Sequence, residues 1–388
     1  MPLELTPLDA LPPAVEKVAG AKAPAALKLM AARGLAPLGP ADLLTAIYQL
    51  AQGDDATVKA AASKSATELP EKIFQGALGE PLDARVLDFF ARRLWQKPKL
   101  LEILLLNKAT DDETVRHLAT LCAESELELI AKNEERLLRA PGIIAALYLN
   151  PKTRMSTAQR ALELAVRNHV RVEGIPAFDE AVRAIEQSGA LSAEEQAAVD
   201  AAFQRAAEVA VDAMAGLLTA ASPEEEAAMQ AAEALLAEQQ ASGEVPPESA
   251  EEIDEKKEKL EKLTPAAKIR MAQLGNAFTR AVLIRDTNRQ VSMACIRSPG
   301  VTDAEAMRYA INRGLDDDVI RFIANKRQWV RLYGVKVALC NNPKCPLPVS
   351  MRFLPHLRPP DLKALSRSKG IPSALSSAAK QLLSSRGV

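Results

Sequence analysis

Residues 139–152 read RAPGIIAALYLNPK, and residues 331–344 read RLYGVKVALCNNPK. Both stretches place an apolar run between a Gly and an Asn-Pro-Lys triplet, at positions 192 residues apart. The same shift aligns residues 93–167 with residues 285–359 without a gap, and 15 of these 75 positions are identical. A self-match of this length and regularity indicates an internal duplication.

The residues shared by the two copies predict short helices. Residues 110–113 (TDDE) and 302–305 (TDAE) follow the capping-box pattern, in which Thr begins a helix and Glu bonds back to the Thr amide. Asn150 and Asn342 each precede a Pro. We expect each Asn to end a helix in the left-handed conformation and each Pro to begin the next helix.

The same marks recur within each copy. Asn107 lies 43 residues before Asn150, and Ser298 lies 44 residues before Asn342. Only 4% of the chain is aromatic, and apolar residues recur at three-to-four spacing rather than alternating. A repeat of this length, built of short helices stacked in pairs, is typical of an α-solenoid. The sequence therefore predicts an all-α fold, an α-solenoid in two duplicated blocks.

On repeat length, short helices and Asn-Pro punctuation, the chain resembles the HEAT-like and leucine-rich-repeat-variant families of bacterial helical-repeat proteins. The resemblance covers about residues 72–185 and 265–385. Proteins of this kind are usually binding scaffolds, so the resemblance implies a scaffold rather than an enzyme.

Four segments are expected along the chain. Residues 1–70 form an N-terminal helical cap, 71–186 the first repeat block, 187–264 an acidic helical insert and 265–388 the second repeat block. The insert is rich in Ala and Glu, and residues 192–195 (SAEE) and 222–225 (SPEE) predict capping boxes that open two helices.

The charge of the chain is divided unevenly among these segments. The 49 Lys+Arg and 50 Asp+Glu leave a net charge of -1. Residues 1–170 have a net charge of zero. Residues 171–264 hold 7 basic and 22 acidic side chains, whereas residues 265–388 hold 21 basic and 7 acidic ones. The insert is either a solubilising helical hairpin or an acidic mimic that covers the basic block. Such a sign asymmetry carries information about partners.

The basic block is the best functional signal in the sequence. Positions held by Glu134 and Glu135 in the first copy correspond to Lys326 and Arg327 in the second. The candidate partner-binding residues form a stripe on the solenoid surface, and they are Lys326, Arg327, Trp329, Arg331, Lys336, Lys344, Arg352, Arg358 and Lys363. The alternative is that these are ordinary solvated helix faces, because several of them are shared with a neutral first copy.

No chemistry-bearing motif is found. Cys340 and Cys345 align with Tyr148 and Thr153 of the first copy, so these positions accept residues that do not bind zinc. The sequence lacks phosphate-binding, dinucleotide-binding, serine-hydrolase and zinc-protease motifs. We expect no catalytic activity, no cofactor and no metal site.

The compartment is inferred from what the sequence lacks. No apolar run is long enough for a transmembrane segment, and no cationic region followed by an apolar core marks a secretory signal. The sequence predicts a cytoplasmic protein.

Two functional hypotheses follow. In the first, a non-enzymatic scaffold binds a protein partner, with the basic block recognising an acidic surface. In the second, the basic block binds nucleic acid through its phosphates without reading sequence, and the acidic insert masks it. The first is favoured because the 22 acidic side chains of residues 171–264 repel a polyanion.

Overall fold

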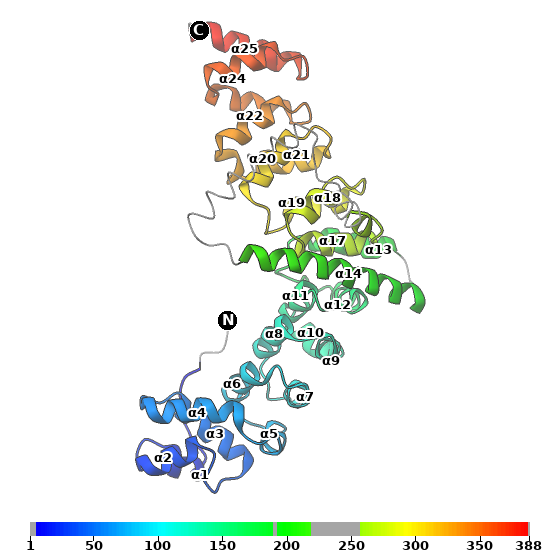
Figure 1. The fold of residues 1–388 in the computed structure, drawn as a ribbon. Coiled ribbons are helices and arrows are strands. Elements are labelled where there is room, and N and C mark those ends of the chain that lie inside the picture. The colour runs from blue at the N-terminus through cyan, green and yellow to red at the C-terminus, as the bar shows by residue number, and fades with distance from the viewer. Residues whose placement is uncertain (1–4, 189–191, 219–256, 387–388) are drawn as a thin grey trace. The chain divides into compact units, whose positions relative to one another are not determined.

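The computed structural model describes residues 5–188, 192–218 and 257–386, and these form many short helices and no strand (Figure 1). The predicted all-α class is confirmed. Within the described residues, no helix is long and apolar enough to cross a membrane. The capping box predicted at residues 222–225 lies outside the described residues.

The chain divides into two compact units, Met1–Gly174 and Ile175–Val388. The first contains α1 (Pro13–Ala19), α2 (Ala25–Ala32), α3 (Pro40–Ala51), α4 (Ala56–Glu68), α5 (Glu71–Leu78), α6 (Ala84–Leu94), α7 (Pro98–Leu106), α8 (Asp112–Leu121), α9 (Glu124–Ala131), α10 (Glu134–Arg139), α11 (Gly142–Leu149) and α12 (Met155–Arg167). The second contains α13 (Phe178–Ser188), α14 (Ala193–Leu218), α17 (Pro265–Leu274), α18 (Ala277–Leu283), α19 (Arg289–Arg297), α20 (Asp303–Ile311), α21 (Asp317–Asn325), η1 (Trp329–Arg331), α22 (Tyr333–Asn341), α23 (Leu347–Phe353), η2 (Leu354–His356), α24 (Pro359–Arg367) and α25 (Ser373–Ser385).

Helices pack mainly on near neighbours in the sequence. In the first unit α5 packs on α7 and α7 on α9, while α6 packs on α8 and α8 on α11. In the second unit α17 packs on α19 and α19 on α21, while α20 packs on α22 and α22 on α24. The packing within each unit is therefore mostly local, and apolar side chains buried between neighbouring helices form its core. Helix α6, for example, buries Val86, Phe89, Phe90 and Leu94.

The helices at positions 192 residues apart correspond. Shifted by 192, α8 spans 304–313 and α11 spans 334–341, against Asp303–Ile311 for α20 and Tyr333–Asn341 for α22. A glycine lies at each contact, Gly142 where α11 packs on α8 and Gly334 where α22 packs on α20. A Cβ at Gly142 would lie 2.9 Å from Arg116 Cδ, and one at Gly334 would lie 2.6 Å from Met307 Sδ. The shared glycine therefore leaves room for the Arg116 side chain against α11 and for the Met307 side chain against α22.

Three buried asparagines link successive helix ends. The Asn107 amide donates to the Leu78 and Glu80 carbonyls, and the Asn342 amide donates to the Ala310 and Asn312 carbonyls. Asn150 bonds likewise to two carbonyls about 30 residues earlier. In each case the side-chain oxygen accepts the backbone N–H two residues later. Each asparagine therefore satisfies carbonyls that a helix end leaves without intrahelical partners.

This geometry corrects the expected role of the Asn-Pro pairs. Asn150 and Asn342 have φ of -86° and -94°, so neither adopts the left-handed conformation. Pro151 and Pro343 lie in the turn that follows, before α12 and α23 begin. Each asparagine acts through its side-chain amide rather than through a left-handed backbone conformation.

The predicted capping boxes have different outcomes. The box that opens α20 is confirmed, since Thr302 and Glu305 bond to each other's backbone amides. The one at Ser192 is also confirmed, because Ser192 and Glu195 exchange the same two bonds. The box at Thr110 was wrong: Thr110 is buried and its hydroxyl donates to the Leu104 carbonyl, so Asp111 caps α8 instead.

Two segments expected in separate regions pack within the second unit. Helix α13, assigned from the sequence to the first block, packs on α17 and α19. Helix α14, the first helix of the acidic insert, packs on α17. Phe203 is fully buried, and the Arg270 guanidinium carbon lies 4.3 Å from the centroid of its ring. The insert is therefore joined to the second unit through this helix.

Candidate binding surface of the second unit

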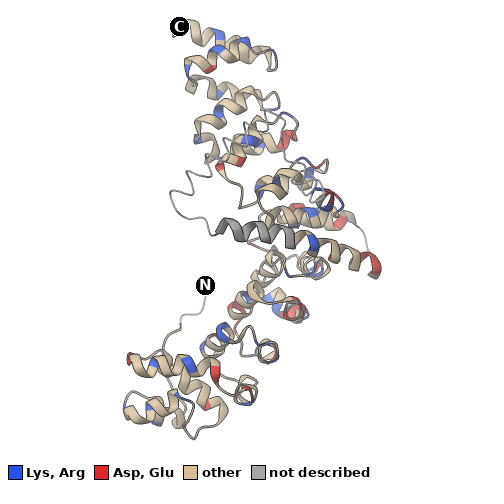
Figure 2. Ribbon diagram, viewed as in Figure 1, with Lys and Arg blue, Asp and Glu red and all other residues tan. Residues whose placement is uncertain are grey.

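The nine candidate residues lie between the end of α21 and the middle of α24, in a region rich in Lys and Arg (Figure 2). We call the eight cationic members the basic surface. Five of them are exposed, namely Arg327, Arg331, Arg352, Arg358 and Lys363. Lys326, Lys336 and Lys344 are partly exposed.

Trp329 is not part of this surface, contrary to the prediction. Its side chain is fully buried, and its ring packs edge-on against Phe322 with centroids 6.1 Å apart. Lys326 Nζ lies 3.8 Å from the centroid of the Trp329 ring, close enough for a cation–π contact. Trp329 thus holds the ammonium group of Lys326 in place but does not present its own ring to a partner.

Two more of the cationic residues, besides Lys326, make local contacts. Lys344 Nζ donates to the Leu315 carbonyl at 2.6 Å and lies 3.5 Å from Asp317, so its charge is partly neutralised. The Arg358 guanidinium lies 4.6 Å from the centre of the Tyr333 ring, and the Arg358 amide donates to the Tyr333 hydroxyl. That hydroxyl donates in turn to Asp361. Burial and the bond to Asp361 raise the pKa of Tyr333.

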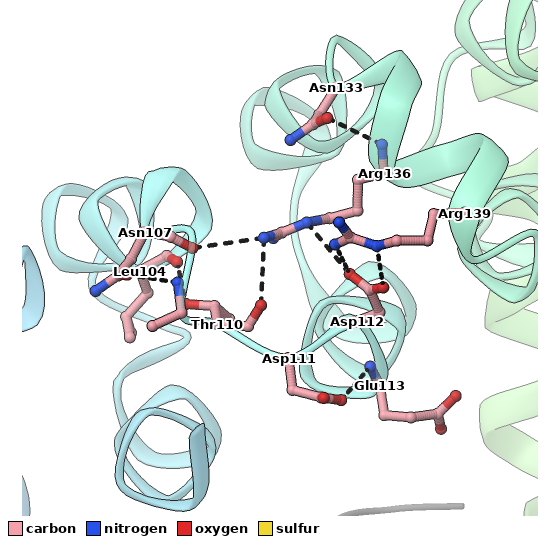
Figure 3. A network of polar contacts seen from close by, with 10 residues as sticks. Leu104, Asn107, Thr110, Asp111, Asp112, Glu113, Asn133, Arg136 and Arg139 are labelled. Atoms are coloured by element: carbon pink, nitrogen blue, oxygen red, sulfur yellow. Dashed lines mark hydrogen bonds and ion pairs between the residues drawn. The ribbon is translucent and has the colours of Figure 1, made fainter. Parts of the chain in front are cut away.

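In the first unit, arginines at corresponding positions are paired with carboxylates. Arg139 donates twice to Asp112, both at 2.7 Å, and Arg136 lies beside the same carboxylate at 3.4 Å (Figure 3). Arg136 also donates to the Asn107 and Thr110 carbonyls. The hydrogen bonds from Arg139 hold the pKa of Asp112 below its usual range. Two further arginines of this unit are paired as well, Arg116 with Glu113 at 2.7 Å and Arg160 with Glu128 at 3.5 Å.

The arginines 192 residues later have lost these partners. Arg331 and Arg352 correspond to Arg139 and Arg160, but Asp112 is replaced by Ala304 and Glu128 by Ile320. Within the part of the chain that the structure describes, Arg331 and Arg352 form no ion pair. Compared with the first unit, the basic surface therefore differs both by missing acidic partners and by additional basic side chains.

Arg308, which corresponds to Arg116, also lacks a carboxylate partner among the described residues, but for a different reason. Glu305, which corresponds to Glu113, is turned inward and bonds bidentately to Arg280, at 3.0 Å for both oxygens. The Glu305 and Arg280 side chains are 2% and 7% exposed. Burial opposes ionisation of Glu305, but the bonds from Arg280 and Thr302 outweigh it and lower its pKa. Arg308 is left exposed, without an ion pair to any described residue.

Beside the basic surface lies a shallow apolar groove between α20 and α22. It encloses about 470 Å³ and is lined by Ile311, Arg313, Tyr333, Val337, Asn341 and Asp361, among others. Ile311 is 59% exposed, and Met307, against Gly334 at the wall of the groove, is 38% exposed. This groove was not predicted from the sequence. The signal was present in α20, which carries two apolar stripes, one buried (Ala306 and Ala310) and one exposed (Met307 and Ile311).

The described residues include all four cysteines and the side-chain types that bind metal ions. They contain no cluster of three or more His, Cys, Asp or Glu that could hold a metal ion. All four cysteines are buried, and burial raises the pKa of Cys122 and of Cys340 to about 12, so their thiolates are scarce at neutral pH.

Comparison with known proteins found no match to this chain among protein-family models, curated proteins or solved structures.

Proposed function

We propose that the protein is an α-solenoid scaffold of the HEAT-like kind, without enzymatic activity, whose basic surface binds an acidic protein partner. The observation that carries the proposal is the set of arginines in the second unit that lack the carboxylates of their first-unit counterparts. A guanidinium without an internal partner is free to pair bidentately with a carboxylate from another molecule.

The solenoid architecture is supported by two features of the described helices. Alternate helices contact each other along both units, as expected where each repeat packs only on its neighbours. Buried asparagines at Asn107, Asn150 and Asn342 make the same pair of bonds to an earlier helix end. A repeated linkage of this kind is consistent with a duplicated repeat unit.

A protein partner is favoured over nucleic acid by the chemistry around the basic surface. Binding of single strands uses exposed aromatic rings on which bases stack. Here Trp329 is buried, and the Tyr333 ring lies under the Arg358 guanidinium. Exposed apolar side chains of this region include Met307 and Ile311, beside a groove, which suits a protein surface.

Nucleic acid remains the second candidate because unpaired guanidinium groups suit phosphate as well as carboxylate. The two candidates differ in the salt dependence of their binding. Each phosphate contact on duplex DNA contributes a slope of about -0.9 in the dependence of log affinity on log salt. Tight DNA binding with a steep slope, and no binding to acidic peptide, would favour this candidate.

The test compares two double variants of the full chain that remove the same charge. Arg331→Gln/Arg352→Gln alters the basic surface, and Arg139→Gln/Arg160→Gln alters the corresponding paired residues of the first unit. The probes are a fluorescent Glu/Ser peptide of about 15 residues and a duplex DNA, titrated by anisotropy over a salt series. We call the peptide the acidic probe.

The first variant is expected to bind the acidic probe about tenfold more weakly than the wild-type chain, from two ion pairs of up to about 1 kcal/mol each. The second is expected to bind it unchanged, because its arginines are already paired. Equal losses in the two variants, or no binding of the acidic probe at low salt, would contradict the proposal.

A further inference from the structure

The groove between α20 and α22 has apolar walls from both helices. Met307 and Ile311 stand one helical turn apart on α20, and Val337 and Ala338 lie on α22. Gly334 leaves room for the Met307 side chain, since a Cβ there would lie 2.6 Å from Met307 Sδ. Exposed fractions of 38% for Met307 and 59% for Ile311 leave apolar surface that a ligand can cover.

The polar side chains that line the groove are one cation, Arg313, together with Tyr333, Asn341 and Asp361. Arg313 lines it and donates one hydrogen bond to the Asn341 carbonyl, which leaves other guanidinium N–H groups available. Arg308 follows Met307 on α20 and is exposed. Neither arginine forms an ion pair with a described residue. At the other end, Arg358 lies over the Tyr333 ring.

The single carboxylate that lines the groove is already engaged. Asp361 accepts a hydrogen bond from the Tyr333 hydroxyl, which also fixes that side chain at the end of the groove. The groove therefore combines apolar side chains with one lining guanidinium group, Arg313, that forms no ion pair with a described residue, and the exposed Arg308 lies on the same helix as Ile311. The complement of the groove is a segment with apolar side chains on one face and carboxylates beside them.

We infer that this groove is the anchor site for an acidic amphipathic segment of the partner, with two apolar side chains between Met307, Ile311 and Val337 and a carboxylate at Arg313. The inference rests on the proposed function and deepens it by naming the chemistry of the partner. Recognition of this kind places apolar anchors three or four residues apart, on one face of a helix.

The test uses the acidic probe and an anchored probe, in which three Ser are replaced by Leu at about three-to-four spacing. Both are titrated with the wild-type chain and with two double variants. Met307→Ser/Ile311→Ser removes the apolar wall of the groove. Leu347→Ser/Met351→Ser is the matched control, because these side chains of α23 are 37% and 39% exposed and lie outside the groove. Neither variant changes the net charge.

The wild-type chain is expected to bind the anchored probe about tenfold more tightly than the acidic probe, a gain that partial burial of two Leu side chains supplies. Met307→Ser/Ile311→Ser is expected to abolish this gain without changing affinity for the acidic probe, and the control is expected to retain it. Circular dichroism of each variant confirms that the helices are kept.

The inference is overturned if the anchored probe binds no more tightly than the acidic probe, or if the gain survives in Met307→Ser/Ile311→Ser. It is also overturned if the control loses the gain to the same extent. These results can be told apart from failure of the proposed function, because that failure shows as unchanged affinity of the acidic probe for the Arg331→Gln/Arg352→Gln variant.

Discussion

Removal of the Asn342 side chain is expected to loosen the second unit locally. The amide donates to the Ala310 carbonyl at 2.8 Å and to the Asn312 carbonyl at 3.2 Å, and its oxygen accepts the Lys344 N–H at 3.0 Å. The residue is 2% exposed, and its bond to Ala310 is buried while the other two are part-buried, so Asn342→Ala leaves these groups with little solvent to replace the lost partner. At about 1 kcal/mol for each bond, the change costs about 3 kcal/mol.

Hydrogen exchange with mass spectrometry measures this effect where it arises. An opening free energy lowered by about 3 kcal/mol accelerates exchange roughly 100-fold in peptides covering residues 310–345, when exchange reports the opening equilibrium. The control is Asn341→Ala, since among the described residues the Asn341 side-chain amide bonds only to the Val337 carbonyl in its own helix. Its effect is expected to stay within about threefold, for a bond worth about 0.5 kcal/mol at a partly exposed site.

The reasoning is refuted if Asn342→Ala accelerates exchange by less than about threefold, well short of the loss of three hydrogen bonds made by a buried side chain. It is also refuted if Asn341→Ala has an equal effect, because the linkage to the earlier helix end would then contribute nothing.

Two further predictions concern buried groups. Glu305→Gln leaves the buried Arg280 charge without its carboxylate and is expected to destabilise the second unit by about 3 kcal/mol at pH 7. Because folding lowers the pKa of Glu305, its contribution is complete above the unfolded pKa of about 4.3 and is lost as pH falls through the folded pKa. Thermal unfolding of wild type and variant between about pH 3 and pH 7 should therefore show a gap that narrows in acid, and a constant gap would contradict the assignment. The four buried thiols are expected to react slowly with an aromatic disulfide reagent at pH 8 in the native chain and rapidly in urea, because burial raises the pKa of Cys122 and of Cys340 to about 12. Absorbance of the released thiolate follows the reaction, and rapid labelling of the native chain would contradict the burial.

The sequence predicted the helical class and several helix starts because these depend on local chemistry. Thr302 and Glu305 are near neighbours, and their reciprocal bonds need nothing from the rest of the chain. The same pattern at Thr110 predicted the wrong cap, because the Leu104 carbonyl at the end of α7 lies within reach of its hydroxyl. Such a competing acceptor is set by the turn between two helices, which the four-residue pattern does not contain.

The candidate site was predicted by charge but not by geometry. The cationic residues are on the surface, as long charged side chains usually are. Trp329 was grouped with them by proximity in sequence, yet its large apolar area is buried against Phe322. The difference between paired and unpaired arginines was also hidden, because Arg139 and Asp112 are 27 residues apart and meet only when α10 packs near α8.

The central claim is that the second unit binds acidic partners because its arginines lack internal carboxylates. Restoring one carboxylate tests this without removing any base. Ala304 is exposed and occupies the position of Asp112, in the first turn of α20, where an acidic side chain is favourable. The matched control is Ala304→Asn, which has nearly the same shape and no charge.

The deciding measurement is the affinity of the acidic probe for the full chain carrying Ala304→Asp. The account predicts binding about three- to fivefold weaker than wild type, as Arg331 becomes paired internally at up to about 1 kcal/mol, while Ala304→Asn binds as wild type does. Unchanged affinity in Ala304→Asp, or an equal decrease in Ala304→Asn, would contradict the claim that unpaired arginines form the binding surface.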